Sequence, residues 1–242
     1  MKLSEILDPK LSYHETLNKK LWKADKLDPK VKTKLMEIAR KFVSTLELSD
    51  AVIEDYVITG SNCNYNYTKQ SDLDIHILVS KDKLKDCKTC KVESEDCLQA
   101  KKSLWNDRHE ITIYGIPVEV YVTTESEKLV AGAGTYSLLK DEWISKPKKT
   151  KVKADAVQVS AKAEEIANEI DQLIDAKSND EDQIKELTDK ISRMRSAGLQ
   201  DSGEFSIENL TFKALRNNGY IDKIRQYAVK AQDDVLSLKG KP

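Results

Sequence analysis

The strongest constraint on the fold lies in one short segment, Ser71–Val79, which reads SDLDIHILV. Successive side chains of a β-strand point to opposite faces, so Asp72, Asp74 and His76 are expected on one face and the apolar side chains on the other. The apolar face can pack on a helix, while the opposite face presents two carboxylates about 7 Å apart along the strand. Carboxylates held together repel each other, and such a pair is typical of a site for a hard divalent cation such as Mg²⁺.

A third carboxylate is predicted on a neighbouring strand. The run Val118–Thr123 alternates valines with polar side chains, and Gly115–Pro117 separates it from the β-rich run Glu110–Tyr114, as in a hairpin. If the valines face the core, Glu119 points to the same side as the two aspartates. Three carboxylates on two adjacent strands can bridge two Mg²⁺ ions about 3.5–4 Å apart, the spacing used in two-metal phosphoryl-type transfer.

The dipeptide Gly60-Ser61, which ends a short predicted strand, indicates a phosphate-binding turn. Glycine lets the backbone approach a ligand closely, and turn N–H groups with a serine hydroxyl can hold a terminal phosphate. Polar side chains fill the loop that follows and are candidates to contact the nucleotide, the amides at the ribose or base edges and the tyrosines by stacking on the base: Asn62, Asn64, Tyr65, Asn66 and Tyr67. The alternative is that they only build the loop, because Asn is a frequent turn residue.

Two further polar side chains flank the acidic pair and are assigned to the nucleotide-binding set. Ser71 directly precedes Asp72, and His76 shares the predicted carboxylate face. His76 either orients the substrate or supports the acidic pair through a hydrogen bond, and the second reading is slightly favoured.

These motifs together carry a family resemblance. Gly60-Ser61, Ser71-Asp72-Leu73-Asp74 and the strand around Glu119 resemble the nucleotidyltransferase superfamily related to DNA polymerase beta. The longer run TGSNCNYNYTKQSDLDIHILV resembles predicted nucleotidyltransferases that are common in bacteriophage genomes, as do AKKSLWNDRHEITIYGIPVEVYV and TYSLLKDEWISKPKK. The superfamily resemblance covers about residues 50–125, and the phage-type resemblance covers most of the chain.

The resemblance implies an α+β fold with a small mixed sheet flanked by helices. It implies that Asp72, Asp74 and Glu119 are the catalytic residues and hold two Mg²⁺ or Mn²⁺ ions, and that Gly60 and Ser61 hold the β- and γ-phosphates of an NTP such as ATP. An acceptor would attack the α-phosphorus and release pyrophosphate. The acceptor stays open among a protein side chain, a small molecule, a nucleotide and an RNA end. Glu119 departs from the family pattern, in which the third carboxylate is more commonly Asp.

Two other functions stay open on the same fold. One is a catalytically silent nucleotide-binding protein or phage structural component, because a fold alone does not guarantee activity. The other is an oligonucleotide synthase, in which the acceptor is a second NTP. The complete set of three carboxylates favours an enzyme, because an inactive domain gains nothing from holding repelling charges together.

Three regions of the chain differ in pattern. Residues 1–50 indicate an arm and a helix, residues 51–150 the catalytic domain, and residues 151–242 a helical region. The helical region carries apolar stripes at helical spacing, which predict a bundle core or a homodimer surface.

Composition bears on the partners and the location that this chain is expected to have. The formal net charge is −1, which argues against a protein that binds nucleic acid over its whole surface. No apolar run approaches the ~20 residues of a membrane helix, and the first residues lack a secretory signal, so the expected location is the cytoplasm, of the host if the chain is phage-encoded.

Cysteine spacing gives a weak metal signal. Cys87, Cys90 and Cys97 stand at C-x₂-C-x₆-C spacing, which is incomplete for a tetrahedral zinc site. Reduced thiols are therefore expected there more than zinc.

Overall fold

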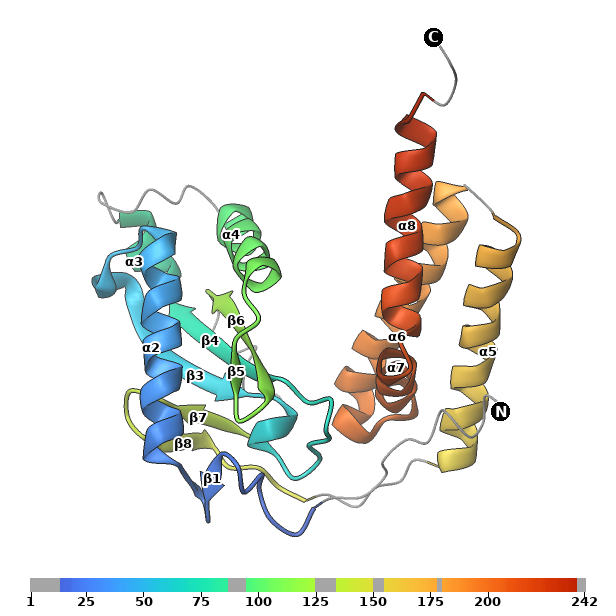
Figure 1. Cartoon of the computed structure of the whole chain (residues 1–242). Helices are drawn as coiled ribbons and strands as arrows, with labels where there is room; N and C mark the ends of the chain where they lie inside the picture. The colour runs from blue at the N-terminus through green and yellow to red at the C-terminus, as the bar shows by residue number, and fades with distance from the viewer. Residues whose placement is uncertain (1–13, 87–94, 125–133, 150–154, 178–179, 239–242) are drawn as a thin grey trace. The chain divides into compact units, whose positions relative to one another are not determined.

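The computed structural model describes residues 14–86, 95–124, 134–149, 155–177 and 180–238 (Figure 1). The chain divides into two compact units. One is Tyr13–Thr150, and the other combines Met1–Ser12 with Lys151–Pro242. Within the described residues, no helix is both long and apolar enough to span a membrane.

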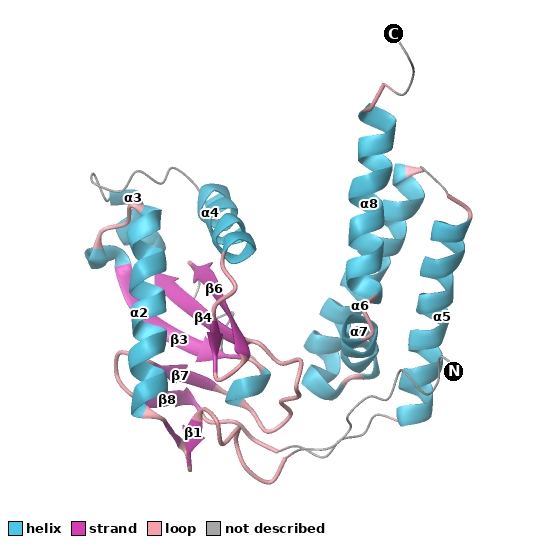
Figure 2. Cartoon of the chain, viewed as in Figure 1, coloured by secondary structure: helices cyan, strands magenta, loops and turns pink. Residues whose placement is uncertain are grey.

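The Tyr13–Thr150 unit is built on a six-stranded sheet with the strand order β5-β6-β4-β3-β7-β8. Its strands are β3 (Ile53–Thr59), β4 (Leu73–Val79), β5 (Thr112–Ile113), β6 (Ile116–Thr123), β7 (Thr135–Ser137) and β8 (Glu142–Ser145). The β4–β6 pair is parallel and the other neighbouring pairs are antiparallel. A separate two-stranded ribbon consists of β1 (Trp22–Lys23) and β2 (Lys26–Leu27). This small mixed sheet with flanking helices confirms the predicted α+β class (Figure 2).

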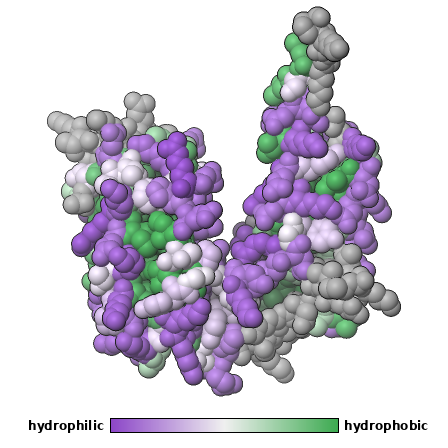
Figure 3. All heavy atoms as spheres, viewed as in Figure 1, coloured by the Kyte–Doolittle hydropathy of each residue, from purple (hydrophilic) through white to green (hydrophobic). Residues whose placement is uncertain are grey.

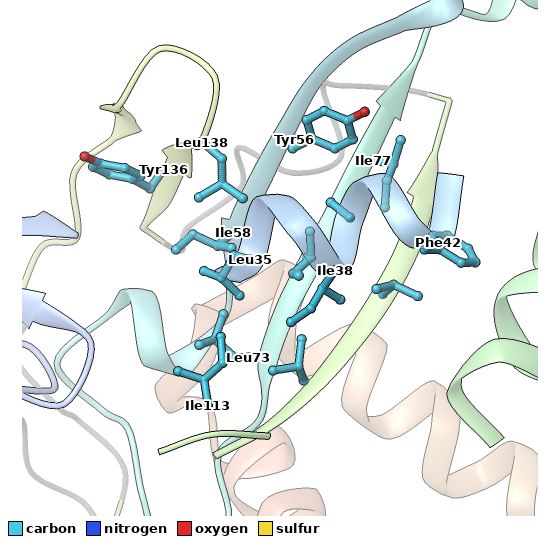
Figure 4. Packing of buried hydrophobic residues seen from close by; sticks show 14 of the residues in the cluster. Leu35, Ile38, Phe42, Tyr56, Ile58, Leu73, Ile77, Ile113, Tyr136 and Leu138 are labelled. Atoms are coloured by element: carbon cyan, nitrogen blue, oxygen red, sulfur yellow. The ribbon is translucent and has the colours of Figure 1, made fainter. Parts of the chain in front are cut away.

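Helix α2 (Pro29–Leu46) covers one face of the sheet. The Asp28 carboxylate accepts a hydrogen bond from the Lys30 N–H at 2.8 Å, and Pro29 occupies the first turn, as the sequence predicts. The helix then buries a stripe made of Val31, Leu35, Ile38, Phe42 and Leu46. Figure 4 shows Leu35, Ile38 and Phe42 of this stripe beside apolar side chains of the strands. Each fully buried side chain of this size stabilises the fold by about 1.5–3 kcal/mol.

The two faces of β4 are chemically distinct. On the face toward α2, Leu73, Ile75 and Ile77 are completely buried, whereas the intervening polar side chains are half-buried. The same alternation runs along β6, with the valines buried and Glu119 and Tyr121 half-buried. The period-two pattern of the sequence is therefore realised on both strands.

A helical connection carries the chain from β4 to β6 through α3 (Lys81–Asp86) and α4 (Glu95–Arg108). Helix α4 lies beside β6, and its side chains bond to the backbone of that strand. The Asn106 amide donates to the Val120 carbonyl at 3.0 Å and accepts from the Val120 N–H at 3.1 Å. The Gln99 amide donates to the Val122 carbonyl at 3.3 Å. Helix α4 thus satisfies backbone groups that a free strand edge would leave exposed, where short β5 no longer pairs with β6.

The hairpin turn lies one residue earlier than predicted. Ile113 pairs with Ile116, so the turn consists of Tyr114 and Gly115, with φ values of 50° and 79°. Positive φ at both central positions is the requirement of a type I′ hairpin turn, and Gly115 meets it without strain. Ile116 and Pro117, predicted in the turn, belong to β6 instead.

The second unit contains four described helices: α5 (Ala156–Asp175), α6 (Glu181–Ser202), α7 (Ile207–Asn217) and α8 (Tyr220–Leu236). Asp155, Asp180 and Ser206 cap the first three by accepting hydrogen bonds from backbone N–H groups of the first turn. Figure 3 shows hydrophobic side chains along the upper part of α8, where Val229 and Leu236 are exposed. The predicted homodimer through these helices stays a prediction.

Candidate active site

Three carboxylates converge on the polar face of the β4–β6 pair. The parallel register places Asp74 opposite Glu119, and Asp72 lies two residues before Asp74 on the same face. One oxygen from each of the three side chains lies within 4.8 Å of the others, and all three residues are half-buried. A cluster made only of carboxylate oxygens fits Mg²⁺ or Mn²⁺, which prefer hard oxygen ligands. The structure brings together the three predicted ligands, while their catalytic role stays a prediction.

The backbone at Gly60 forms one wall of this cluster. Gly60 follows β3 with φ of 85°, and β3 places Thr59 opposite Asp74. A Cβ atom at Gly60 would stand 2.6 Å from Oδ2 of Asp74, closer than any real contact of this kind. Glycine is therefore required here twice, for its left-handed φ and for the space that the carboxylate occupies.

A serine pair closes the loop that joins β3 to β4. Gly60 leads into a short 3₁₀ helix, η2 (Ser61–Cys63). The Ser61 hydroxyl donates to the Ser71 hydroxyl oxygen at 2.7 Å, and the Thr68 N–H donates to the same Ser71 oxygen at 2.8 Å. The two predicted phosphate-side serines thus lie in contact across the loop, and both ends of the loop are fixed beside the carboxylates.

Asn62 organises this region and has the loop-building role that the sequence left as the alternative to nucleotide contact. Its buried amide donates to the backbone carbonyls of Ser71 and Asp72 at 3.2 and 2.6 Å. Its side-chain oxygen accepts from the Asn18 amide at 2.9 Å, and its backbone carbonyl accepts from the Trp22 indole N–H at 2.8 Å. Its partners Trp22 and Asn18 stand 40 and 44 residues away in the sequence, so a local motif cannot predict these contacts.

The N-terminal segment also holds the rest of the loop. The His14 N–H donates to the Tyr65 carbonyl at 2.7 Å, and the His14 ring stacks on Tyr67 with 3.8 Å between centroids. Asn64 is buried and accepts from the Tyr65 N–H at 2.8 Å, while Lys149 lies over the Tyr65 ring at 4.8 Å. Asn64 and Tyr65 therefore have roles in building the loop, and their contact with a nucleotide stays a prediction.

The polar face continues past the carboxylates with His76 and Tyr121. Their rings stack with 4.8 Å between centroids, and Nδ1 of His76 lies 3.0 Å from the Thr123 hydroxyl. The Tyr121 hydroxyl donates to Oε2 of Glu119. This hydrogen bond fixes the Glu119 carboxylate within the cluster of three carboxylates.

Burial sets the charge of both aromatic side chains. Burial, followed by the positive charge of Lys102, lowers the pKa of His76 to about 4. Burial and the hydrogen bond to Glu119 raise the pKa of Tyr121 above its usual value. At neutral pH His76 is therefore uncharged, and Tyr121 keeps the proton that it donates to Glu119.

The predicted cysteine group falls largely beyond what the structure covers. Cys87 and Cys90 lie outside the described residues, and Cys97 is half-buried. Cys63 is fully buried beside the site, and burial raises the pKa of its thiol well above the usual value.

Comparisons with known proteins find weak matches among solved structures alone. No family model and no curated protein matches the chain. A STING-associated CdnE c-di-GMP synthase from Capnocytophaga granulosa is 12% identical, with a TM-score of 0.23, covering 86% of this chain and 84% of that one. A CdnE cyclic dinucleotide synthase from Elizabethkingia meningoseptica, solved with GTP and Apcpp, is 12% identical with a TM-score of 0.27 and covers 98% of both chains. A CdnE c-UMP-AMP synthase from Rhodothermus marinus is 10% identical with a TM-score of 0.22, covering 99% and 97%. At TM-scores this low, these likenesses carry no argument about the present chain.

Proposed function

We propose that this protein is a nucleotidyltransferase that moves a nucleoside monophosphate from an NTP to an acceptor and releases pyrophosphate. The observation that carries the proposal is the convergence of Asp72, Asp74 and Glu119 beside the Gly60-Ser61 turn. Metal-ligating carboxylates and a glycine turn are the two parts that a polyanionic substrate requires, since one holds cations and the other admits phosphate oxygens.

The chain's own residues have separate tasks in this proposal. Asp72 and Asp74 would hold both divalent ions, and Glu119, oriented by Tyr121, would complete the shell of one. Bound Mg²⁺ would supply charge neutralisation at the phosphates and activation of the acceptor oxygen. Gly60 and Ser61 would bind the terminal phosphates through backbone N–H groups and a hydroxyl.

The bond changes follow from this placement. The acceptor oxygen forms a bond to the α-phosphorus and loses its proton to solvent. The bond between the α-phosphorus and the bridging oxygen breaks, and that oxygen leaves with the electron pair as part of pyrophosphate. In-line displacement places the incoming oxygen opposite the leaving oxygen.

The hydrogen-bonded loop around the carboxylates favours an enzyme over a catalytically silent domain. Asn62, Ser71 and Gly60 fix the backbone around the carboxylates before any substrate arrives. Preorganised charges and dipoles are the largest source of transition-state stabilisation in many enzymes. A purely structural domain would be more stable with neutral side chains in place of three clustered carboxylates.

The first experiment measures binding, because it requires no knowledge of the acceptor. Thermal unfolding is followed with each of four NTP analogues that resist cleavage, with and without Mg²⁺ or Mn²⁺. We expect at least one analogue to raise Tm only when the metal is present. The double variant Asp72→Asn with Asp74→Asn should lose this shift. Glu54→Gln, on the exposed side of β3, is the matched control and should keep it.

The second experiment identifies the product. The protein is incubated with α-labelled NTPs and metal, and pyrophosphate and labelled products are separated. Label on protein would indicate a protein acceptor, and soluble linear or cyclic products would indicate the oligonucleotide synthase. Metal-dependent binding without pyrophosphate release, across acceptors of all four classes, would favour the catalytically silent protein. Absence of metal-dependent binding would overturn the proposed function.

A further inference from the structure

The polar face of the β4–β6 pair extends in one direction beyond the carboxylates. Because β3 runs antiparallel to β4 with Thr59 opposite Asp74 and Val57 opposite His76, the Gly60-Ser61 turn lies toward the start of β4. His76 and its partner Tyr121 lie on the other side of the carboxylates, about 7 Å further along the strands at ~3.3 Å per residue. The carboxylates therefore separate the turn from the aromatic pair.

A cation from another element reaches this far end. Lys102 lies on α4, which hydrogen-bonds along β6 through Gln99 and Asn106. The Lys102 ammonium stands over the Tyr121 ring, 4.7 Å from its centroid. In the part of the chain that the structure describes, no carboxylate forms an ion pair with Lys102.

The proposed reaction gives this end of the site a role. If the turn holds the leaving pyrophosphate, in-line attack brings the acceptor from the opposite side of the carboxylates. That side is the one where Lys102, His76 and Tyr121 meet. The Tyr121 hydroxyl is engaged with Glu119, and the Lys102 ammonium stands over the Tyr121 ring, so Lys102 brings a positive charge to this cluster.

Charge balance indicates what Lys102 recognises. Two divalent ions outweigh three carboxylates by one positive charge, which the NTP more than cancels. An acceptor that brings a further negative charge would be repelled unless a cation faces it. Lys102 is placed to face such an acceptor, and its aromatic neighbours hold its position through cation–π contact and stacking.

From these observations, and resting on the proposed function, we propose that Lys102 is a substrate-binding residue that holds a phosphate group of the acceptor. The acceptor would then be a small phosphorylated molecule, and Lys102 would select it over the same molecule without phosphate. A charge-assisted hydrogen bond of this kind contributes about 1.5–3 kcal/mol, which corresponds to roughly 10- to 100-fold in affinity.

The test uses the full chain loaded with Mg²⁺ and the NTP analogue that stabilises it. Calorimetric titration then compares the four nucleoside 5′-monophosphates with the corresponding nucleosides. We expect at least one monophosphate to bind about 10-fold or more tightly than its nucleoside. Lys102→Met should remove this difference, and Lys102→Arg should keep most of it. Lys101→Met is the matched control, because Lys101 is the neighbouring α4 lysine that turns toward Glu47 instead, at 3.9 Å.

The outcomes separate this inference from the proposed function. If the unmodified protein does not bind any NTP analogue, the result counts against the proposed function itself. Normal loading in every variant, with monophosphate and nucleoside bound equally or neither bound, overturns the role of Lys102. The same conclusion follows if Lys102→Met and Lys101→Met weaken monophosphate binding equally. Inorganic phosphate should compete with the monophosphate in the unmodified protein and lose that effect in Lys102→Met.

Discussion

The two faces of β4 differ in chemistry, because alternate residues of the strand are apolar on one face and polar on the other. Toward α2, Leu73, Ile75 and Ile77 lose all contact with water and stabilise the fold. On the other face, Asp72 and Asp74 stay half-buried and close to a third carboxylate, an arrangement that costs stability until cations bind. The comparison teaches that stability and function can be separated here by moving one residue along the chain.

The sharpest test of this separation is Asp74→Asn. On the proposed function, we expect it to lower nucleotidyl transfer by about a thousandfold or more, because a ligand shared by two ions would contribute several kcal/mol to the transition state. In metal-free buffer with EDTA the same variant should be more stable than the unmodified protein, by about 1 kcal/mol, because one repelling charge is gone. Transfer rates and urea unfolding measure the two effects. A variant that is both inactive and less stable in EDTA would show that Asp74 serves the fold.

The neighbouring residue should give the reverse result. Ile75 is completely buried on the α2 face, so Ile75→Ala should lower the free energy of unfolding by about 2–5 kcal/mol. Metal-dependent binding of the NTP analogue by the folded fraction should stay close to the unmodified value. Urea unfolding and calorimetry at low temperature check both. Ile75→Val, with an expected cost of about 0.5–1.5 kcal/mol, gives the same comparison if the alanine variant fails to fold.

A substitution at Tyr121 tests whether its hydrogen bond to Glu119 contributes to metal binding in the proposed function. Tyr121→Phe keeps the stacking on His76 but removes the hydrogen bond to Glu119. We expect affinity for Mg²⁺ or the transfer rate to fall by about 10- to 100-fold, the usual cost of losing a partner of a metal ligand. A titration of Mg²⁺ into the analogue-bound protein measures this. Thr123→Val, two residues further along β6, is a control that should leave Mg²⁺ affinity unchanged.

The amino-acid sequence predicts the two faces well because the period of a strand is local. Asp72 and Asp74 fall on one side whatever else the chain does, and the valines around Glu119 determine its side in the same way. Alternation does not determine the register between strands. That Asp74 stands opposite Glu119 depends on how the helical connection through α4 packs, which no local pattern contains.

The contacts of Asn62 and Lys102 could not be predicted from the sequence, for a common reason. Asn62 bonds to Asn18 and Trp22, and Lys102 reaches the Tyr121 ring because α4 lies along an unpaired edge of β6. Each contact joins parts of the chain that are far apart in sequence or belong to different elements. The predicted hairpin turn began one residue too late. Tyr114 has a positive φ in the turn, which is uncommon for a tyrosine and cannot be predicted from its residue type.

A further expected effect is the pH dependence of stability that His76 adds to the polar face. Its folded-state pKa is about 4, whereas an unfolded histidine titrates near ~6.5. Between these values the unfolded chain binds a proton that the folded chain refuses, so this contribution is complete above pH ~6.5 and is lost as the pH falls toward 4. At ~1.4 kcal/mol per pKa unit the full effect over this interval is of the order of 3–4 kcal/mol, of which about 2 kcal/mol falls between pH 7 and pH 4.5.

His76→Phe should therefore flatten the stability curve over this interval. Urea unfolding in EDTA is compared at pH 7 and pH 4.5 for the unmodified protein, His76→Phe, and the control His109→Gln, whose side chain is exposed. We expect the unmodified protein and the control to lose stability in parallel, and His76→Phe to lose about 2 kcal/mol less. Three parallel curves would mean that the imidazole takes up its proton in the folded state. In that case the far end of the polar face would carry a second positive charge beside Lys102 at low pH.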